Sequence, residues 1–272
     1  MPLKRSTVLN TSLVVPNTTS RSETPSTHLK TRKTPIVRPL PVAILAGGLG
    51  TRLYPLTKHT PKAMLPIHGV PFIIHQLRLL HSRGIKHVVL CVGHFGDQIY
   101  DFVGDGSAFG LKVEYSWDGG QERGTAGALR KALPKFGRAF FVLYGDSYLP
   151  CDYLAVQEAF LSSGKPALMT VFRNDGQWDD SNVQFEQGQI WAYSKLHRTQ
   201  HMHYIDYGLG VFKSSIFATL PEGERWDLVE VYQPLLARKE LAAFEAQERF
   251  YEVGSVDGRR TLHEFLLGQN DD

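Results

Sequence analysis

The chain has 272 residues, of which 42% are hydrophobic and 21% are charged. This composition excludes collagen-like, coiled-coil and wholly disordered proteins, and the length suits one large α/β domain or two small ones. No apolar run approaches the ~20 residues that a membrane-spanning helix needs. The two cysteines, Cys91 and Cys151, are far apart in the sequence. We therefore expect neither a disulfide scaffold nor a zinc cluster, but a soluble protein of a reducing compartment such as the cytoplasm.

The net charge of +3 is unevenly distributed along the chain. Residues 1–40 hold seven Lys or Arg and one acid, Glu23, so the rest of the chain carries a net charge of about −3. A domain with this balance lacks the basic footprint of a nucleic-acid-binding protein. We expect neither nucleic acid nor a membrane as a partner of the domain.

The first 40 residues are rich in Ser, Thr and Pro and have little periodicity, which predicts a disordered basic extension. A transit peptide and a basic tail for nucleic acid or anionic lipid are alternatives, although no amphipathic helix is evident. The apolar stretch around Leu13–Val15 is too short for a secretory signal. We favour a dispensable extension, such as an over-long choice of start site would produce.

Strands and helices alternate from Pro41 onwards. Short apolar runs are typical of buried strands, and apolar residues at helical spacing are typical of helices. We predict strands at Val42–Leu45, His87–Val92, Leu111–Ser116, Ala139–Tyr144 and Pro166–Phe172. Helices are predicted over Pro71–Arg83, from Asp97, over Thr125–Lys135 and over Asp152–Ser163. This alternation indicates an α/β fold with a Rossmann-like, mainly parallel sheet flanked by helices.

The pattern changes after Arg173. Two short strands, Val183–Glu186 and Ile190–Tyr193, flank a Gln-Gly pair and predict a β-hairpin. A further strand is predicted at Tyr207–Phe212, and helices are predicted at Asp227–Lys239 and Gly258–Leu267. We expect one domain, in which a catalytic half is followed by a smaller β-rich substrate-binding half.

A glycine-rich loop with two cations follows the first strand. Gly47, Gly48 and Gly50 allow backbone amides to approach a phosphate closely. Arg52 lies in the loop and Lys62 follows ten residues later, and two fixed positive charges suit a triphosphate. The loop matches neither the dinucleotide fingerprint nor the P-loop. Glycines alone would fit a tight turn equally well, so the hypothesis of a phosphate site rests on the two cations.

The string LAGGLGTRLYPLTKHTPKAMLPIHGVP, which starts at Leu45, closely resembles the signature of sugar-1-phosphate nucleotidyltransferases, the nucleotide-sugar pyrophosphorylases. The resemblance continues through Gly124–Leu129, Tyr144–Asp146 and Glu252–Ser255, and it makes residues 41–270 a nucleotidyltransferase domain. The chain looks most like the short-chain branch that includes heptose-phosphate guanylyltransferases and uridylyl- or thymidylyltransferases. The left-handed helix repeats of bifunctional members are not seen in the sequence.

The resemblance implies the reaction. A sugar phosphate oxygen attacks the α-phosphorus of a nucleoside triphosphate in line, pyrophosphate leaves, and the NDP-sugar serves the synthesis of polysaccharide or related glycan. Mg²⁺ is the implied cofactor, and no protein nucleophile is needed because catalysis rests on positioning and charge neutralisation. The base and the sugar are not determined by these motifs, and a homo-oligomer is left open.

The resemblance also assigns roles to individual residues. It implies contacts with the base and ribose from Leu45, Ala46, Gly47 and Gly48, and with the triphosphate from Gly50, Thr51 and Arg52. Lys62 would contact phosphate oxygens at the reacting centre. Gly124 and Thr125 correspond to the family's base- and sugar-contacting turn, and Asp146 corresponds to its magnesium ligand. An aspartate after a strand often merely caps the next helix, but its Gly-Asp context favours the ligand.

Three further assignments fall where the sequence departs from the family's usual pattern, either at the residue itself or beside it. Lys195 corresponds to a lysine that binds the sugar phosphate, although Ser194 stands where an acid usually precedes it. Asp206 falls where members often have Asn-Ala-Gly beside the sugar, and a structural hydrogen bond is an equally good interpretation. Glu252 stands where many members have a second metal-binding aspartate. Glutamate is one methylene longer but also ligates Mg²⁺.

Other function classes remain as alternatives. A non-catalytic nucleotide-sugar-binding paralogue that regulates a partner would be marked by loss of Arg52, Lys62 or Asp146, and all three are present. A molybdenum-cofactor nucleotidyltransferase shares the glycine loop and the lysine, but not the long second half. A retaining glycosyltransferase would usually have an Asp-x-Asp metal motif, which Gly145-Asp146-Ser147 does not match.

Overall fold

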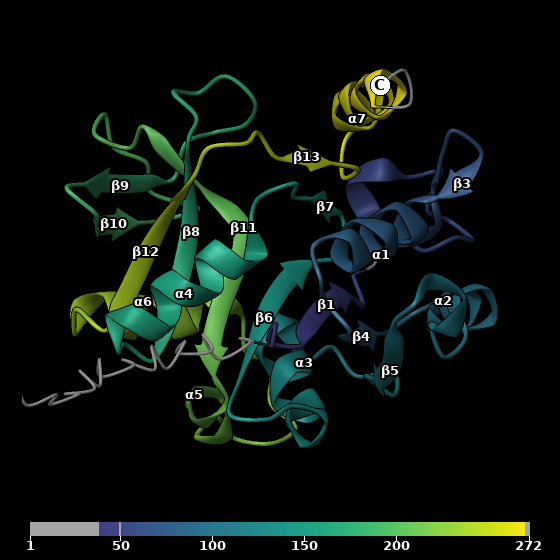
Figure 1. Ribbon diagram of the computed structural model, residues 1–272, viewed down its shortest axis with the longest axis horizontal. Coiled ribbons are helices and arrows are strands. Elements are labelled where there is room, and N and C mark those ends of the chain that lie inside the picture. Colours follow the sequence, from purple (N-terminus) through teal and green to yellow (C-terminus); the bar gives the residue numbers. More distant parts are fainter. Residues whose placement is uncertain (1–37, 49, 270–272) are drawn as a thin grey trace, which may run out of the picture. The chain divides into compact units, whose positions relative to one another are not determined.

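The computed structural model describes residues 38–48 and 50–269 (Figure 1). The predicted extension falls mostly on residues 1–37, which lie outside the described residues. The compact unit begins at Arg38, slightly before the predicted domain boundary. Among the described residues, no helix is long and apolar enough to cross a membrane.

A central sheet organises the unit, with the strand order β10-β9-β11-β6-β1-β4-β5 and with β8 and β12 attached beyond β11. The strands β1 (Val42–Ala46), β4 (His87–Val92), β5 (Lys112–Trp117) and β6 (Ala139–Tyr144) run parallel to one another. Most of their residues are buried, as parallel strands covered by helices on both faces require.

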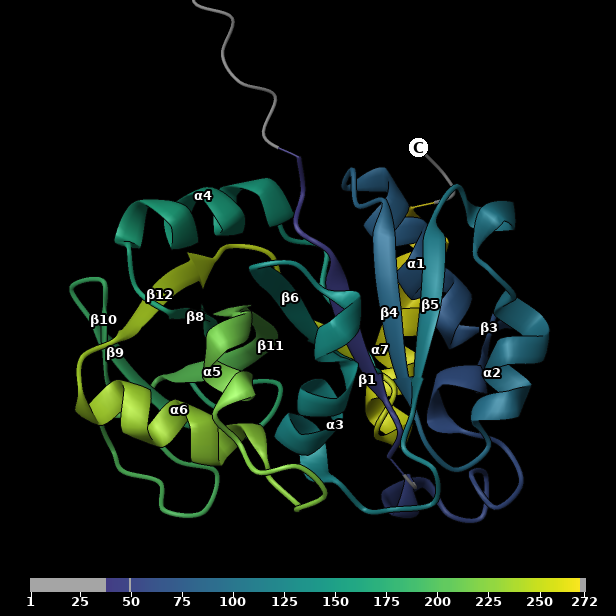
Figure 2. The ribbon, with the colours of Figure 1, turned by 90° about the horizontal axis from the view of Figure 1, so that it is seen from below.

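The strands of the second half complete the sheet: β8 (Ala167–Arg173), β9 (Val183–Glu186), β10 (Gln189–Tyr193), β11 (Tyr204–Lys213) and β12 (Leu241–Ala246). β11 runs antiparallel to both β6 and β8 and so joins the two halves (Figure 2). β12 runs parallel to β8, and β9 and β10 form the predicted hairpin. The expected parallel sheet is therefore confirmed in the first half, whereas the second half is mixed.

Helices cover both faces of the sheet. They are α1 (Phe72–Ser82), α2 (Gly96–Val103), α3 (Gly124–Ala132), α4 (Tyr153–Ser163), α5 (Ser214–Ala218), α6 (Leu228–Ala237) and α7 (Val256–Gly268). Val42 and Ile44 of β1 belong to the hydrophobic core that α1, α2 and α4 help to form, whereas Ala43 belongs to the core that α3, α5 and α6 help to form. The period-two alternation of β1 thus places one helical layer on each side.

Two pairs of short strands lie outside this sheet: β2 (Pro66–Ile67) with β3 (Val70–Pro71), and β7 (Ser147–Tyr148) with β13 (Tyr251–Glu252). The second pair places the segment that precedes α7 beside the end of β6 (Figure 1). Residues that are about a hundred positions apart in sequence are neighbours there, and this pairing shapes the candidate site.

Most predicted elements are confirmed, with small shifts at their ends. The helix predicted over Thr125–Lys135 ends at Ala132 and continues as a single 3₁₀ turn, where Pro134 interrupts the helical hydrogen bonds. The helix predicted from Gly258 begins at Val256, since Ser255 accepts a hydrogen bond from the Gly258 amide and caps it.

Arg38 and Leu40 are anchored to α4. The Leu40 amide donates to Gln157 Oε1 at 2.7 Å, and Gln157 Nε2 donates to the Arg38 carbonyl at 3.1 Å. Leu40 also packs against the core. We expect a chain that begins at Val37 to melt like the full chain, whereas a chain that begins at Pro41 melts several degrees lower. Each lost hydrogen bond costs about 1 kcal/mol, or about 2–4 °C in a unit of this size.

Thermal denaturation followed by circular dichroism measures the difference. Equal melting temperatures for the two shortened chains would show that the anchor contributes nothing. A lower melting temperature for the chain that begins at Val37 would show that the extension stabilises the domain.

Candidate active site

A cavity of about 940 Å³ opens at the carboxyl ends of the parallel strands. Ligands of open α/β sheets bind at this edge. The cavity is lined by most of the residues that the sequence singled out: Leu45, Ala46, Gly47, Gly48, Gly50, Thr51, Lys62, Gly124, Thr125 and Asp146. Arg52, Lys195, Asp206 and Glu252 are not part of this lining and are placed individually below.

The glycine loop is shaped by close contacts that a larger residue would disturb. Gly50 has a φ of 66°, and the Thr57 hydroxyl donates to its carbonyl at 2.9 Å. A Cβ at Gly47 would lie 2.7 Å from Asp118 Oδ2. The same Cβ would lie 3.3 Å from the backbone nitrogen of Gly93, so the loop at Gly47 runs closely between the end of β4 and the Asp118 carboxylate that follows β5.

The turn after β6 carries Asp146. The Gly145 amide donates to the Leu45 carbonyl at 3.0 Å, and a Cβ at Gly145 would lie 2.5 Å from that oxygen. The Val253 amide donates to the Asp146 carbonyl at 2.9 Å. Glycine at position 145 thus lets the turn approach the end of β1, which puts Asp146 beside the glycine loop.

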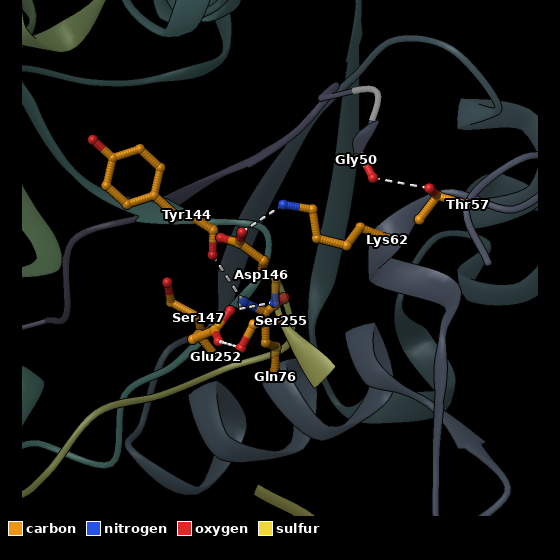
Figure 3. A network of polar contacts seen from close by, with 10 residues as sticks. Gly50, Thr57, Lys62, Gln76, Tyr144, Asp146, Ser147, Glu252 and Ser255 are labelled. Atoms are coloured by element: carbon orange, nitrogen blue, oxygen red, sulfur yellow. Dashed lines mark hydrogen bonds and ion pairs between the residues drawn. The ribbon is translucent and has the colours of Figure 1, made fainter. Parts of the chain in front are cut away.

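Lys62 and Asp146 form an ion pair at the centre of the site. Lys62 Nζ donates to Asp146 Oδ2 at 2.6 Å (Figure 3). The two side chains are 18% and 22% exposed, so water screens the pair only partly. The structure thus brings together two residues that are 84 positions apart in the sequence.

Arg52 and Glu252 meet Asp146 around Gly254. A Cβ at Gly254 would lie 2.7 Å from Glu252 Oε2, 3.1 Å from Asp146 Oδ2 and 3.4 Å from a terminal nitrogen of Arg52. The Arg52 side chain is exposed and forms no ion pair or hydrogen bond with any described residue. The missing side chain of Gly254 thus leaves room for two carboxylates and a cation to converge.

The Glu252 carboxylate also organises the start of α7. Its Oε2 accepts from the Gly254 amide and its Oε1 accepts from the Ser255 hydroxyl (Figure 3). A Cβ at Gly258 would overlap the same carboxylate. Glu252 therefore has a structural role at this helix end, and its predicted role as a metal ligand stays a prediction.

The donor set near Asp146 fits a hard divalent cation. Nowhere in residues 38–48 and 50–269 do three or more His, Cys, Asp or Glu side chains form the kind of cluster that builds a metal site wholly from protein ligands. The two neighbouring carboxylates match Mg²⁺, which takes one or two carboxylates and completes its shell with substrate phosphates and water. Asp146 and Glu252 are the residues that would hold such an ion.

Gly124 and Thr125 line the cavity, but their segment is tied to the start of α6. The amides of Ala126 and Gly127 donate to the Trp226 carbonyl at 2.8 and 3.1 Å, and the Thr125 amide donates to Asp227 Oδ1 at 3.1 Å. These amides at the start of α3 are therefore occupied by the chain itself. The predicted substrate contacts of this turn must come from other atoms of these residues.

Asp206 and Lys195 lie in the second half, next to the cavity wall. Asp206 Oδ2 accepts from the Tyr193 hydroxyl at 3.2 Å and Oδ1 accepts from the Gly208 amide at 3.1 Å, which matches the structural interpretation of this residue. Lys195 Nζ lies 5.2 Å from the centroid of the Tyr144 ring, and Tyr144 lines the cavity. Burial, helped by the Asp206 and Asp146 carboxylates, raises the pKa of Tyr144 well above its ordinary value. The sugar-side roles of Lys195 and Asp206 stay predictions.

The sequence reasoning missed Asp118, which follows β5 and lines the cavity. Its Oδ1 is buried without a hydrogen-bond partner in the part of the chain that the structure describes. Burial raises the pKa of this carboxyl, and the charges of Arg123 and Lys131 oppose the shift. Its position at the carboxyl end of a strand was the available signal, but Asp118-Gly119-Gly120 looks like an ordinary turn.

We expect Asp118→Asn to raise the melting temperature by a few degrees and to enlarge the stabilisation that a bound nucleoside triphosphate confers, because the carboxylate lines the cavity and, when ionised, repels an anionic ligand. The folded-state pKa lies above the unfolded value, so the folded state binds the proton more tightly. The ionised carboxylate therefore destabilises the fold above the pKa, and neutral asparagine removes this penalty.

Thermal denaturation with and without nucleotide, from pH 4 to 8, measures both effects. The stability gained by Asp118→Asn should disappear as the pH falls through the folded-state pKa. An unchanged nucleotide-induced shift would mean that Asp118 serves the cavity wall alone.

Comparisons with known proteins identify the family to which this chain is similar. A family model described as nucleotidyl transferase matches residues 42–182, slightly more than half of the chain. N-acetylmuramate alpha-1-phosphate uridylyltransferase from Neisseria meningitidis serogroup B is 42% identical over 115 residues, which cover 41% of this chain and 49% of that protein. D-glycero-alpha-D-manno-heptose 1-phosphate guanylyltransferase from Campylobacter jejuni is 28% identical over 212 residues, covering 78% and 93%.

The fold is also that of a solved structure. The crystal structure of HddC from Yersinia pseudotuberculosis complexed with GMP-PN has a TM-score of 0.71 at 23% identity and covers 84% of this chain and 99% of that chain. At this identity the likeness shows the fold alone, and it confirms the predicted α/β class. The chain spans about half the length of the first curated relatives that it matches.

Proposed function

The chain belongs to the nucleotidyl transferase family, and we propose that it transfers a nucleoside monophosphate from a nucleoside triphosphate to a sugar 1-phosphate. The products are an NDP-sugar, used as a glycan precursor, and pyrophosphate. One observation carries the proposal: a glycine loop and the Lys62–Asp146 pair line a single cavity at the carboxyl edge of a parallel sheet. A cavity of about 940 Å³ is near the upper end of the usual range for ligand pockets, which suits two substrates together.

The residues support an in-line displacement at the α-phosphorus. The glycine loop lets backbone amides approach the phosphates. Lys62 and the Arg52 guanidinium, which pairs with none of the described residues, neutralise charge that grows as pyrophosphate leaves. Asp146 and Glu252 would hold Mg²⁺, which when bound supplies further charge neutralisation at the phosphate oxygens. Because the sugar phosphate oxygen is the nucleophile, none is required from the protein.

The alternatives explain the site less well. A regulatory paralogue needs a pocket for the nucleotide sugar but no cation at the reacting phosphates, whereas Lys62 lies in the cavity and contacts Asp146. A molybdenum-cofactor nucleotidyltransferase does not account for the second half, whose strand β11 is joined to β6 and extends the sheet.

A substrate panel tests the proposal. Each of five nucleoside triphosphates is combined with several sugar 1-phosphates, and pyrophosphate release is measured with and without Mg²⁺. The names of the relatives direct attention to UTP and GTP with N-acetylmuramate and heptose 1-phosphates. We expect one pairing to exceed the others clearly. Nucleotide-sugar binding without pyrophosphate release from any pairing would instead support the regulatory paralogue.

A further inference from the structure

A buried glutamine of α1 holds the turn that carries Asp146. Gln76 is 1% exposed, and its Nε2 donates to the Tyr144 carbonyl at 3.0 Å and to the Ser147 carbonyl at 2.6 Å (Figure 3). These two carbonyls lie on either side of Asp146 in the sequence. A single amide group therefore bridges the two ends of the turn.

Two hydrogen bonds from the main chain of other segments also restrain the backbone of this turn. The Gly145 amide is bonded to the Leu45 carbonyl of β1, and the Asp146 carbonyl is bonded to the Val253 amide beside β13. Gln76 restrains the turn from a third element, α1. The backbone of the turn is thus held jointly by β1, β13 and the Gln76 side chain, while the carboxylate that projects from it is bound by Lys62.

Only the nitrogen of the Gln76 side-chain amide forms hydrogen bonds with the described residues. Its Oε1 is buried and has no hydrogen-bond partner among the described residues. A buried acceptor without a partner is destabilising, and such groups persist where surrounding structure or function requires them. The hydrogen bonds to the two carbonyls account for the nitrogen of the amide group. A buried position that served packing alone would favour an apolar side chain.

We propose that Gln76 is a positioning residue for the catalytic site: it fixes the Tyr144–Ser147 turn so that Asp146 faces Lys62 and Glu252 in the geometry that a divalent ion needs. The inference rests on the proposed function. Partners that orient a metal ligand typically contribute about 10- to 100-fold to metal affinity or activity. Small displacements of such a carboxylate matter because the reacting groups must be held within a fraction of an ångström.

The chain offers a matched control in Gln157. This glutamine of α4 is 2% exposed and also bridges two main-chain groups, the Arg38 carbonyl and the Leu40 amide. Neither group belongs to the cavity lining. Gln76→Met and Gln157→Met each replace a buried amide by an apolar chain of similar length, so both remove a bridge and leave the volume nearly unchanged.

Binding of Mn²⁺ alone, followed by the loss of the free-ion paramagnetic resonance signal, is compared in the two variants and the unsubstituted chain. We expect both variants to melt at similarly reduced temperatures. Mn²⁺ affinity should fall about 10- to 100-fold in Gln76→Met and stay unchanged in Gln157→Met. In the substrate panel, kcat should fall in Gln76→Met with little change in the KM of the sugar phosphate. Gln76→Asn keeps the amide but shortens the side chain by one methylene. It should show the same loss of Mn²⁺ affinity and of kcat, with a smaller change in the packing of the core.

Gln76 variants that bind Mn²⁺ and turn over as well as Gln157→Met would overturn the inference. The metal titration needs no substrate, so it decides on Gln76 even if the panel yields no NDP-sugar. Failure of the unsubstituted chain to release pyrophosphate from any pairing would count against the proposed function, whereas equal behaviour of the two methionine variants counts against the role of Gln76 alone.

Discussion

Lys62→Ala is expected to lower turnover by about 10²- to 10³-fold, with only a small change in melting temperature. A cation fixed at the reacting phosphates acts mainly as charge develops in the transition state, and losing one such preorganised group has an effect of this size. The side chain is 18% exposed and its partner Asp146 is 22% exposed, so water screens their ion pair only partly, and its loss should cost about 1 kcal/mol, or a few degrees of melting temperature. Steady-state pyrophosphate release and thermal denaturation measure the two effects.

Lys58→Ala is the matched control, because Lys58 lies on the same loop but is exposed and does not line the cavity. It should retain full activity. Lys62→Arg keeps the charge but changes its shape and reach, so partial activity would show that charge matters beyond position. Near-normal turnover of a folded Lys62→Ala chain would remove this lysine from the mechanism.

The parts of the site that are local in sequence could be predicted from it. The pattern of a buried strand followed by glycines, an arginine and a lysine lies within one short segment, so it can be recognised from the sequence. The structure places the glycines and Lys62 at one cavity. The same holds for Asp146, which follows an apolar strand directly. Backbone chemistry and strand-end geometry are enough to place such residues at one edge of a parallel sheet.

Residues whose role depends on distant contacts were beyond the reach of the sequence. Gln76 is one polar residue in a helix with a largely apolar buried face, and its carbonyl partners are 68 and 71 positions away. The partner of Thr125, Asp227, is 102 positions away and looks like a simple helix cap. Nothing in the local sequence distinguishes these side chains from ordinary core or capping residues.

β12 shows the same limit for secondary structure. Its sequence, LAAFEA, contains three alanines and a glutamate, which favour helices over strands. It becomes a strand because it pairs along its whole length with β8. Tertiary pairing thus overrides local propensity, and this strand was not predicted.

Asp146→Asn is expected to abolish turnover at ordinary Mg²⁺ concentrations while the melting temperature stays nearly unchanged. A triphosphate and a sugar phosphate bring several negative charges together, and Lys62 and Arg52 cannot neutralise them alone. Asparagine keeps the shape of the side chain but removes the charge that a divalent ion requires. Pyrophosphate release over a range of Mg²⁺ concentrations, and after removal of metal with excess chelator, measures the dependence.

Asp101→Asn, at an exposed aspartate of α2, is the control and should leave turnover and metal dependence intact.

Glu252→Gln should be milder than Asp146→Asn, because Glu252 also binds the Gly254 amide and the Ser255 hydroxyl, which an amide oxygen still serves in part. Glu252→Asp introduces the residue that the sequence resemblance leads us to expect at this position, and substantial activity is expected. Full activity of Asp146→Asn, or undiminished turnover of the unsubstituted chain in excess chelator, would refute the metal assignment. A silent Glu252→Gln would leave Asp146 as a single-carboxylate site, and the second ligand would have to be sought elsewhere, with Asp206 the next candidate. Each oxygen of Asp206 accepts one hydrogen bond, from Tyr193 or Gly208, and keeps a lone pair for a cation.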